Sequence, residues 1–307
     1  MKMKKRIGAG VAAIALALSL AACGEGTGSS TSEVMSQVGA QGTANMTPKA
    51  ILTQSGKASE DLTDVQANMK AEVKMTAQGE TMNMDIDMDM IAKESPVRAQ
   101  MNMDINLSLG GEKQSQAMNM YMLEENGKVS MYLGMDGKWQ KASIDLGTSQ
   151  EQLEKYSKQV DTSVYTQDAE IFENKGVKKV NGKEVVVLEG ELTGDDMIAA
   201  LKDSGIEDQL AQLGQAGMSL EDFKTQSGMK IVGYYDAETL LPVEMTVDMT
   251  DYFKEVMEKI LTAQNTPAPS DFKVDKYTMT ITYTAFGNKV PEINLPAAAQ
   301  NATTMTL

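Results

Sequence analysis

The sequence contains no histidine and only one cysteine, one tryptophan and seven prolines among 307 residues. Without histidine, the chain lacks the side chain that most often serves as a general acid or base near neutral pH. A Gly-x-Ser-x-Gly elbow and a phosphate-binding loop are also absent, and the carboxylates are spread along predicted exposed faces rather than isolated among apolar neighbours. The sequence therefore predicts a protein that is not an enzyme and that needs no cofactor.

Basic residues and long apolar runs are also scarce. The chain has 28 basic and 43 acidic residues, a formal net charge of −15. This charge repels polyanions, so we expect no nucleic-acid partner and no domain lying flat on anionic lipid. The apolar run at residues 7–22 is shorter than the roughly 20 residues of a membrane-spanning helix. A single cysteine excludes an internal disulfide, so a core of apolar side chains has to stabilise the fold.

The N-terminus has the layout of a secretory signal. Four basic residues within positions 2–6 precede the apolar run, which ends in Leu20-Ala21-Ala22-Cys23. This ending, followed by Gly24, resembles the lipobox of bacterial lipoproteins. The resemblance implies that Cys23 receives a diacylglycerol, with palmitate-type acyl chains, and becomes the mature N-terminus. Two acyl chains suffice for stable anchoring. The alternative is an ordinary export signal with an incidental cysteine.

Three segments follow from this layout. Residues 1–22 are the predicted signal peptide, and residues 23–45, rich in Gly, Ser and Thr, are a predicted flexible tether. Residues 46–302 are the predicted folded domain, which starts with a helix capped by Thr47. We expect an exported monomer, held at the extracytoplasmic face of the cell membrane through its lipid anchor.

Beyond residue 68 the dominant pattern is strict alternation of apolar and polar side chains. In residues 82–90, Met and Ile at even positions alternate with Asn83, Asp85, Asp87 and Asp89. The same period recurs over residues 69–77, 97–109, 118–122, 129–133, 241–249 and 277–285. Strands of this kind joined by short turns predict an antiparallel sheet of about ten strands with one apolar face.

Helical spacing interrupts the strands at a few places. The predicted helices cover residues 149–160, two short stretches within 193–213, and 253–261. Near the C-terminus, two prolines within residues 290–296 predict an edge strand. Together with the strands, these helices indicate an α+β protein: a curved antiparallel β-sheet with helices on its apolar face.

Methionine is the compositional oddity, with 25 copies, many arranged as Met-x-Met pairs that share one face of a strand. Three interpretations stay open. The methionines can form an ordinary packed core, line a cavity that adapts to apolar ligands, or capture Cu(I) through their thioethers. The predicted cavity-lining residues are Met82, Met84, Met88, Met90, Met101, Met103, Met118, Met120 and Met122.

Asp85, Asp87 and Asp89 have the spacing that opens an EF-hand loop, but the rest of that motif is missing. Met90 occupies the position where glycine is needed, and Pro96 the position of the bidentate glutamate. These aspartates are therefore predicted to form the solvated face of their strand. No metal site is predicted from carboxylates.

Three features occur in order along the chain: a strand meander after an N-terminal helix, the hairpin at residues 232–243 with its Asp-x-x-Thr-x-x-Pro turn, and a last strand that leads to the Leu-Pro at residues 295–296. In this order they resemble the LolA/LppX-like bacterial lipoprotein superfamily, in particular its Met-rich, uncharacterised Gram-positive branch.

The resemblance implies an open half-barrel, LolA-like, with helices covering its concave apolar face and a hydrophobic cavity between sheet and helices. It also implies noncatalytic binding of a lipid or acyl chain. The alternatives are a structural or interaction module of the cell envelope with a packed core, and a Met-based copper-binding lipoprotein.

Overall fold

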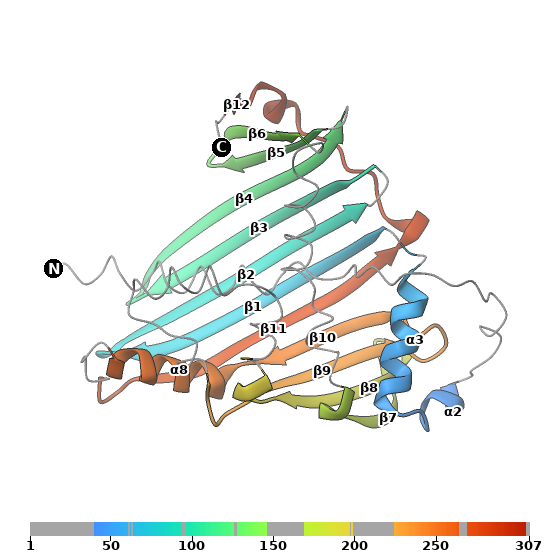
Figure 1. The fold of residues 1–307 in the computed structure, drawn as a ribbon. Helices are drawn as coiled ribbons and strands as arrows, with labels where there is room; N and C mark the ends of the chain where they lie inside the picture. The colour runs from blue at the N-terminus through green and yellow to red at the C-terminus, as the bar shows by residue number, and fades with distance from the viewer. Residues whose placement is uncertain are drawn as a thin grey trace.

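The computed structural model describes residues 40–60, 62, 64–93, 96–125, 128–145, 169–196, 198, 224–263 and 269–304. These residues form one curved, unclosed sheet of twelve strands, in the order β12-β6-β5-β4-β3-β2-β1-β11-β10-β9-β8-β7 (Figure 1). The edges are β12 and β7. The strand alternation thus predicts the type of sheet correctly, but its strand number is higher than the predicted ten.

The strands are β1 (Val65–Ala77), β2 (Glu80–Lys93), β3 (Arg98–Leu109), β4 (Glu112–Glu125), β5 (Lys128–Met135), β6 (Lys138–Asp145), β7 (Phe172–Val180), β8 (Lys183–Leu192), β9 (Met229–Asp236), β10 (Pro242–Asp248), β11 (Lys273–Phe286) and β12 (Thr303–Thr304). The α-helices with described bounds are α2 (Ala40–Thr43), α3 (Pro48–Glu60) and α8 (Thr250–Ala263). Three 3₁₀ turns are η1 (Ala169–Ile171), η3 (Gly287–Lys289) and η4 (Ala297–Asn301).

Two antiparallel meanders meet in the middle of the sheet. Strands β1 to β6 run outward in chain order, and β7 to β11 run inward from the opposite edge until β11 pairs with β1 along nearly its whole length. The short strand β12 pairs with β6 in parallel, whereas the other pairs are antiparallel. Since β1 and β11 are far apart in sequence, their pairing is what joins the two meanders into one sheet.

The main core lies on one face of this sheet, which we call the methionine face. Ile51 of α3 and Phe253 and Val256 of α8 belong to the same buried cluster as the inward side chains of the strands. Phe253 meets Tyr277 of β11 edge-on, with 5.0 Å between the ring centroids. Both helices therefore pack against the methionine face, near the end of the sheet formed by β7 to β11 (Figure 1).

The helix starts follow the sequence signals. Thr47 Oγ1 accepts a hydrogen bond from the amide of Ala50, as expected of the predicted N-cap of α3. The predicted helix at residues 253–261 is α8. The predicted helix at residues 149–160 and most of the stretch at 193–213 lie outside the described residues, as do residues 1–39 with Cys23.

The described chain begins inside the segment predicted as a tether. Helix α2 contacts β7 and β8, and the Asn174 side-chain amide donates to the carbonyls of Thr43 and Met46, at 3.2 and 2.8 Å. Thr43 is fully buried. The composition of residues 40–45 did not predict this packing, because Asn174, which holds the segment in place, is distant in sequence.

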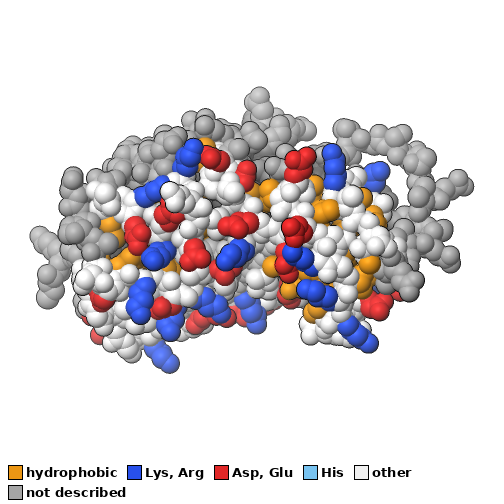
Figure 2. All heavy atoms as spheres, turned by 90° about the horizontal axis from the view of Figure 1, so that it is seen from below, with side chains coloured by type: hydrophobic (Ala, Val, Ile, Leu, Met, Phe, Trp, Pro, Cys, Tyr) orange, Lys and Arg blue, Asp and Glu red, His pale blue; other side chains and the backbone are white. Residues whose placement is uncertain are grey.

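The opposite face of the sheet, called here the polar face, carries the charged side chains of the strands. Asp85 and Asp89 are exposed, and Asp87 forms an ion pair with Lys70 at 3.4 Å. The predicted solvated face of this strand is thus present. Figure 2, a view from below, shows acidic and basic side chains interspersed over much of the visible surface.

Part of the polar face is covered by residues 290–302, which we call the C-terminal strap. The predicted edge strand at 290–296 is wrong, because this stretch has irregular backbone and continues into η4. Its Ile293 and Ala299 are buried against Tyr121, Leu123 and Tyr132 in a second, smaller core. The two prolines block strand pairing, and the apolar side chains between and after them pack across the strands instead.

Candidate ligand-binding surface

A continuous row of methionines crosses five neighbouring strands on the methionine face. Each residue of this methionine row stands directly opposite the next in the strand register. The row consists of Met69 on β1, Met88 on β2, Met103 on β3, Met118 on β4 and Met135 on β5. Directly opposed side chains lie about 5 Å apart at Cβ, so the thioethers form one sulfur-rich strip.

Exposure increases along the row. Met69 and Met88 are each 1% exposed and Met103 is 4% exposed, whereas Met118 is half-buried and Met135 is 39% exposed. The strip therefore leads from a packed core under the middle of the sheet to an open apolar surface at β4 and β5. A surface of this kind can accept an apolar ligand at its exposed end, next to side chains that are already packed at its buried end.

All nine methionines predicted to bind a ligand lie on this face. The register places Met90, Met101 and Met120 opposite one another, as a second row beside the first. The remaining members pair with apolar residues of the same face: Met82 with Met75 and Leu109, Met84 with Val73 and Leu107, and Met122 with Ala99 and Met131. The structure brings the nine together, and their contact with a ligand stays a prediction.

The open end of the methionine face, at β4 and β5, carries large apolar side chains that are exposed. Among the described residues, the large apolar side chains that are clearly exposed are Leu109, Met131 and Met135, each at the outer part of this face. Gln116 Nε2 donates to the sulfur of Met135 at 2.8 Å. This contact holds the Met135 thioether against β4, so the strip continues to the edge of β5.

The tyrosines near the helices are neutral. Burial raises the pKa of Tyr235, and the nearby Tyr283 adds to the shift; burial also raises the pKa of Tyr277. Both phenols therefore keep their protons at neutral pH. They contribute apolar surface to the methionine face and no charge.

Metal-binding clusters of conventional type are not found in the described ranges. No group of three or more Cys, Asp or Glu side chains there is arranged to hold a metal ion. Among the same residues, no helix combines the length and apolar character needed to cross a membrane.

A cavity of about 440 Å³ lies elsewhere, between the polar face and the C-terminal strap. Sequence analysis did not find it, because residues far apart in the chain line it. One signal was available: Arg98, which lines the cavity, is the only arginine after Arg6.

Comparison with known families assigns the chain to one of them. Residues 47–304 match DUF6612, a family of unknown function, and the chain belongs to this family. No curated protein matches the sequence significantly.

Among solved structures, the chain is similar to the Mycobacterium tuberculosis lipoprotein LppX, with 12% identity, a TM-score of 0.39, and coverage of 81% of this chain and 98% of LppX. It is also similar to LprF from Mycobacterium bovis, with 14% identity, a TM-score of 0.39, and coverage of 82% and 97%. These similarities concern the fold and identify no ligand of this chain.

Proposed function

We propose that this protein is an exported, noncatalytic lipoprotein that binds a lipid or acyl chain against its methionine face. A diacylglycerol on Cys23 anchors it to the extracytoplasmic side of the cell membrane. Helices α3 and α8 stand at one end of the face, and we expect the ligand to lie between the sheet and the helices that cover its concave side.

The observation that carries the proposal is the rise in exposure along the methionine row. An ordinary core would bury the whole row, since each fully buried methionine contributes roughly 1.5 to 3 kcal/mol. Here Met118 is half-buried and Met135 is exposed, although both continue the same row as the buried Met69. An apolar ligand over β4 and β5 would recover this burial.

The chemistry of methionine fits a ligand of variable shape. Its unbranched side chain has three rotatable bonds and a polarisable sulfur, so neighbouring thioethers can repack around different alkyl chains. Fixed aliphatic side chains such as valine would adapt less. The ligand class is therefore defined by apolar character and flexibility rather than by a particular head group.

The test is lipid extraction and native mass spectrometry of the purified full chain carrying Cys23→Ala, which cannot receive its own acyl chains. We expect co-purified lipid, and saturable binding of a fluorescent fatty acid. Met118→Gln should weaken this binding by roughly tenfold, because the ligand would then cover an unpaired amide. The matched control is Asn119→Gln, the next residue in the strand, which points to the polar face.

Two results would overturn the proposal. A protein that carries no lipid and binds no fluorescent fatty acid would be a packed envelope module. A saturable Cu(I) site in competition with a chelator, lost in Met118→Gln, would assign the row to metal capture, because thioethers select Cu(I).

A further inference from the structure

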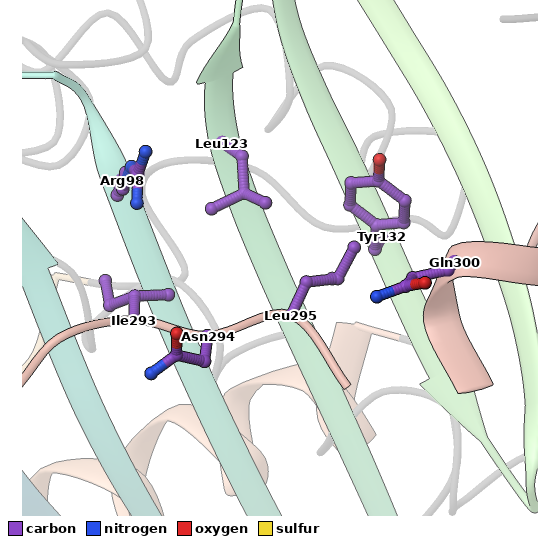
Figure 3. A pocket seen from close by; sticks show the side chains of 7 residues that line it. All are labelled: Arg98, Leu123, Tyr132, Ile293, Asn294, Leu295 and Gln300. Atoms are coloured by element: carbon purple, nitrogen blue, oxygen red, sulfur yellow. The ribbon is translucent and has the colours of Figure 1, made fainter. Parts of the chain in front are cut away.

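The cavity beneath the C-terminal strap has a lining that is more polar than apolar, with one positive charge and a few apolar side chains. Three neighbouring strands supply Arg98, Leu123 and Tyr132, and the strap runs across them (Figure 3). The strap contributes the apolar side chains of Ile293 and Leu295. The remaining lining residues are the amides Asn294 and Gln300.

Arg98 is half-buried, and its Nε is fully buried without any hydrogen-bond partner. An unpaired buried donor of a charged group costs on the order of 1 to 3 kcal/mol or more, so it calls for a partner. Within the described part of the chain, no carboxylate forms an ion pair with Arg98. In a chain with a net charge of −15, an arginine left without an acid is unusual.

Three described carboxylates near Arg98 along the chain and the strands have other partners. Lys93, directly opposite Arg98 in the register, holds both Asp64 and Glu292, at 3.3 and 2.9 Å. Glu124 accepts the amide of Val97 at 3.0 Å. None of these three described carboxylates therefore pairs with the Arg98 guanidinium.

A second cation lies beyond the other end of the cavity. The ammonium group of Lys141 sits over the ring of Tyr132, 4.9 Å from its centroid. Arg98 and Tyr132 are two strands apart, or about 10 Å. Arg98 and Lys141 thus place a positive charge near each end of the cavity, which favours an anion over a neutral molecule.

We propose that this cavity is a binding site for a carboxylate with an apolar tail, and that a medium-chain fatty acid is the class of molecule it accepts. The two terminal nitrogens of the half-buried Arg98 guanidinium, rather than its fully buried Nε, would bind the carboxylate with paired N–H donors, a geometry that a lysine cannot offer. The tail would lie among Leu123, Ile293 and Leu295.

The size of the cavity supports a single chain. Its volume of about 440 Å³ is near the lower end of the roughly 300 to 1,000 Å³ typical of small-molecule sites. Arg98, the one charged residue of the lining, balances one negative charge, so a singly charged carboxylate fits better than a phosphate dianion. The site is on the opposite face of the sheet from the methionine row, so it does not depend on the proposed function.

Trp139, the only tryptophan, provides a direct readout. It packs against Tyr121 with 5.9 Å between ring centroids, within the small core that the strap covers. Titration of the full Cys23→Ala chain with decanoate should change its emission saturably, and decanol should bind roughly tenfold more weakly because it lacks the charge. Acetate, which has no tail, should give no saturable change.

Variants on two elements separate a binding role from a structural one. Arg98→Lys should weaken decanoate binding by roughly tenfold and Arg98→Gln should abolish it. Leu295→Phe, on the strap, should fill the cavity and block binding while the thermal unfolding temperature is kept or raised. Lys70→Gln, which removes the same charge from the polar face away from the strap, should bind decanoate normally.

The outcomes are distinguishable from those of the methionine face. Met118→Gln should leave the decanoate signal at Trp139 unchanged. The proposal is overturned if decanoate gives no saturable signal, if decanol binds as tightly as decanoate, or if folded Arg98→Gln keeps its affinity.

Discussion

Lys93 Nζ lies 2.9 Å from Glu292 Oε1, and this ion pair ties strand β2 to the C-terminal strap. The Lys93 side chain is only 11% exposed, and it also contacts Asp64 at 3.3 Å. The hydrogen bond with Glu292 raises the pKa of Lys93 above its ordinary 10.5. Two segments that leave the sheet at different points, one before β1 and one after β11, are thus held by a single ammonium group.

Replacing Lys93 by Met should loosen the strap. We expect faster hydrogen exchange of the strap amides of Ala299 and Ala302, while exchange in the central strands stays unchanged. Because the folded pKa is raised, the contribution of Lys93 is present below pH 10.5 and is lost as pH rises through the folded value. Lys70→Met is the control, since its partner Asp87 belongs to the sheet. Equal effects of both variants would contradict the prediction.

Substitutions of Met88 test how tightly the buried end of the methionine row is packed. Met88→Leu conserves volume, so it should cost less than about 1.5 kcal/mol of unfolding free energy. Met88→Lys should cost more than about 4 kcal/mol, because it puts an unpaired charge at a site that is fully buried. Urea unfolding followed by circular dichroism measures both. A tolerated lysine would mean that water reaches this part of the face.

Gly134 gives a matching test on the polar face. A Cβ at this position would lie 2.7 Å from Cζ2 of Trp139, so Gly134→Ala has to displace the indole ring. We expect a loss of about 1 to 3 kcal/mol and a shift in tryptophan emission, since this is the only tryptophan. Gly137→Ala, in the next turn, is a useful control because a Cβ there meets no atom within 4 Å but strains a positive φ. It should lower stability without changing the emission of the folded protein.

Glu255 should make the junction between α8 and β9 sensitive to acid. Burial alone would raise the pKa of this carboxylate, but the amides of Ser227 and Gln226 donate to it at 2.8 to 3.0 Å and, with Lys259, keep its pKa below the ordinary 4.5. Its stabilising contribution is therefore present above pH 4.5 and is lost as pH falls through the folded pKa.

The matched variant is Glu255→Gln. It should lower the unfolding free energy by about 1 to 2 kcal/mol at neutral pH. It should also flatten the dependence of stability on pH between about pH 5 and 3. Denaturant unfolding at several pH values measures both effects, and an unchanged slope would show that other carboxylates control acid unfolding.

Local pattern predicted much of the fold because period-two alternation specifies which side of a strand is buried. The alternation in residues 82–90 placed Met88 inward and Asp87 outward, and the register confirms both. The cap at Thr47 and the Asp-x-x-Thr turn of the hairpin at residues 232–243 also depend on residues close together in the chain. The strap was mispredicted because its prolines indicate an edge strand, whereas its burial depends on Tyr121 and Tyr132, which are far away in sequence.

In the candidate sites, too, some features follow from local sequence and others only from the tertiary structure. The nine predicted methionines share one face because alternation fixes the side to which each points. Their order in a row, and the rise in exposure toward Met135, required the strand register. The position of Arg98 as the only arginine after Arg6 singled out one residue of the cavity, but the cavity itself could not be predicted, because its walls come from three strands and the strap.

The sequence by itself determined which side chains face inward along each strand, since this depends only on neighbouring residues and the two-residue repeat of extended backbone. Only the tertiary structure decided which strands are neighbours, that β11 pairs with β1, and that the last residues cross the polar face. These are contacts between segments that are far apart in the chain, and the local sequence of one segment does not specify its partner. They are set by the arrangement in which the whole chain buries the most apolar surface.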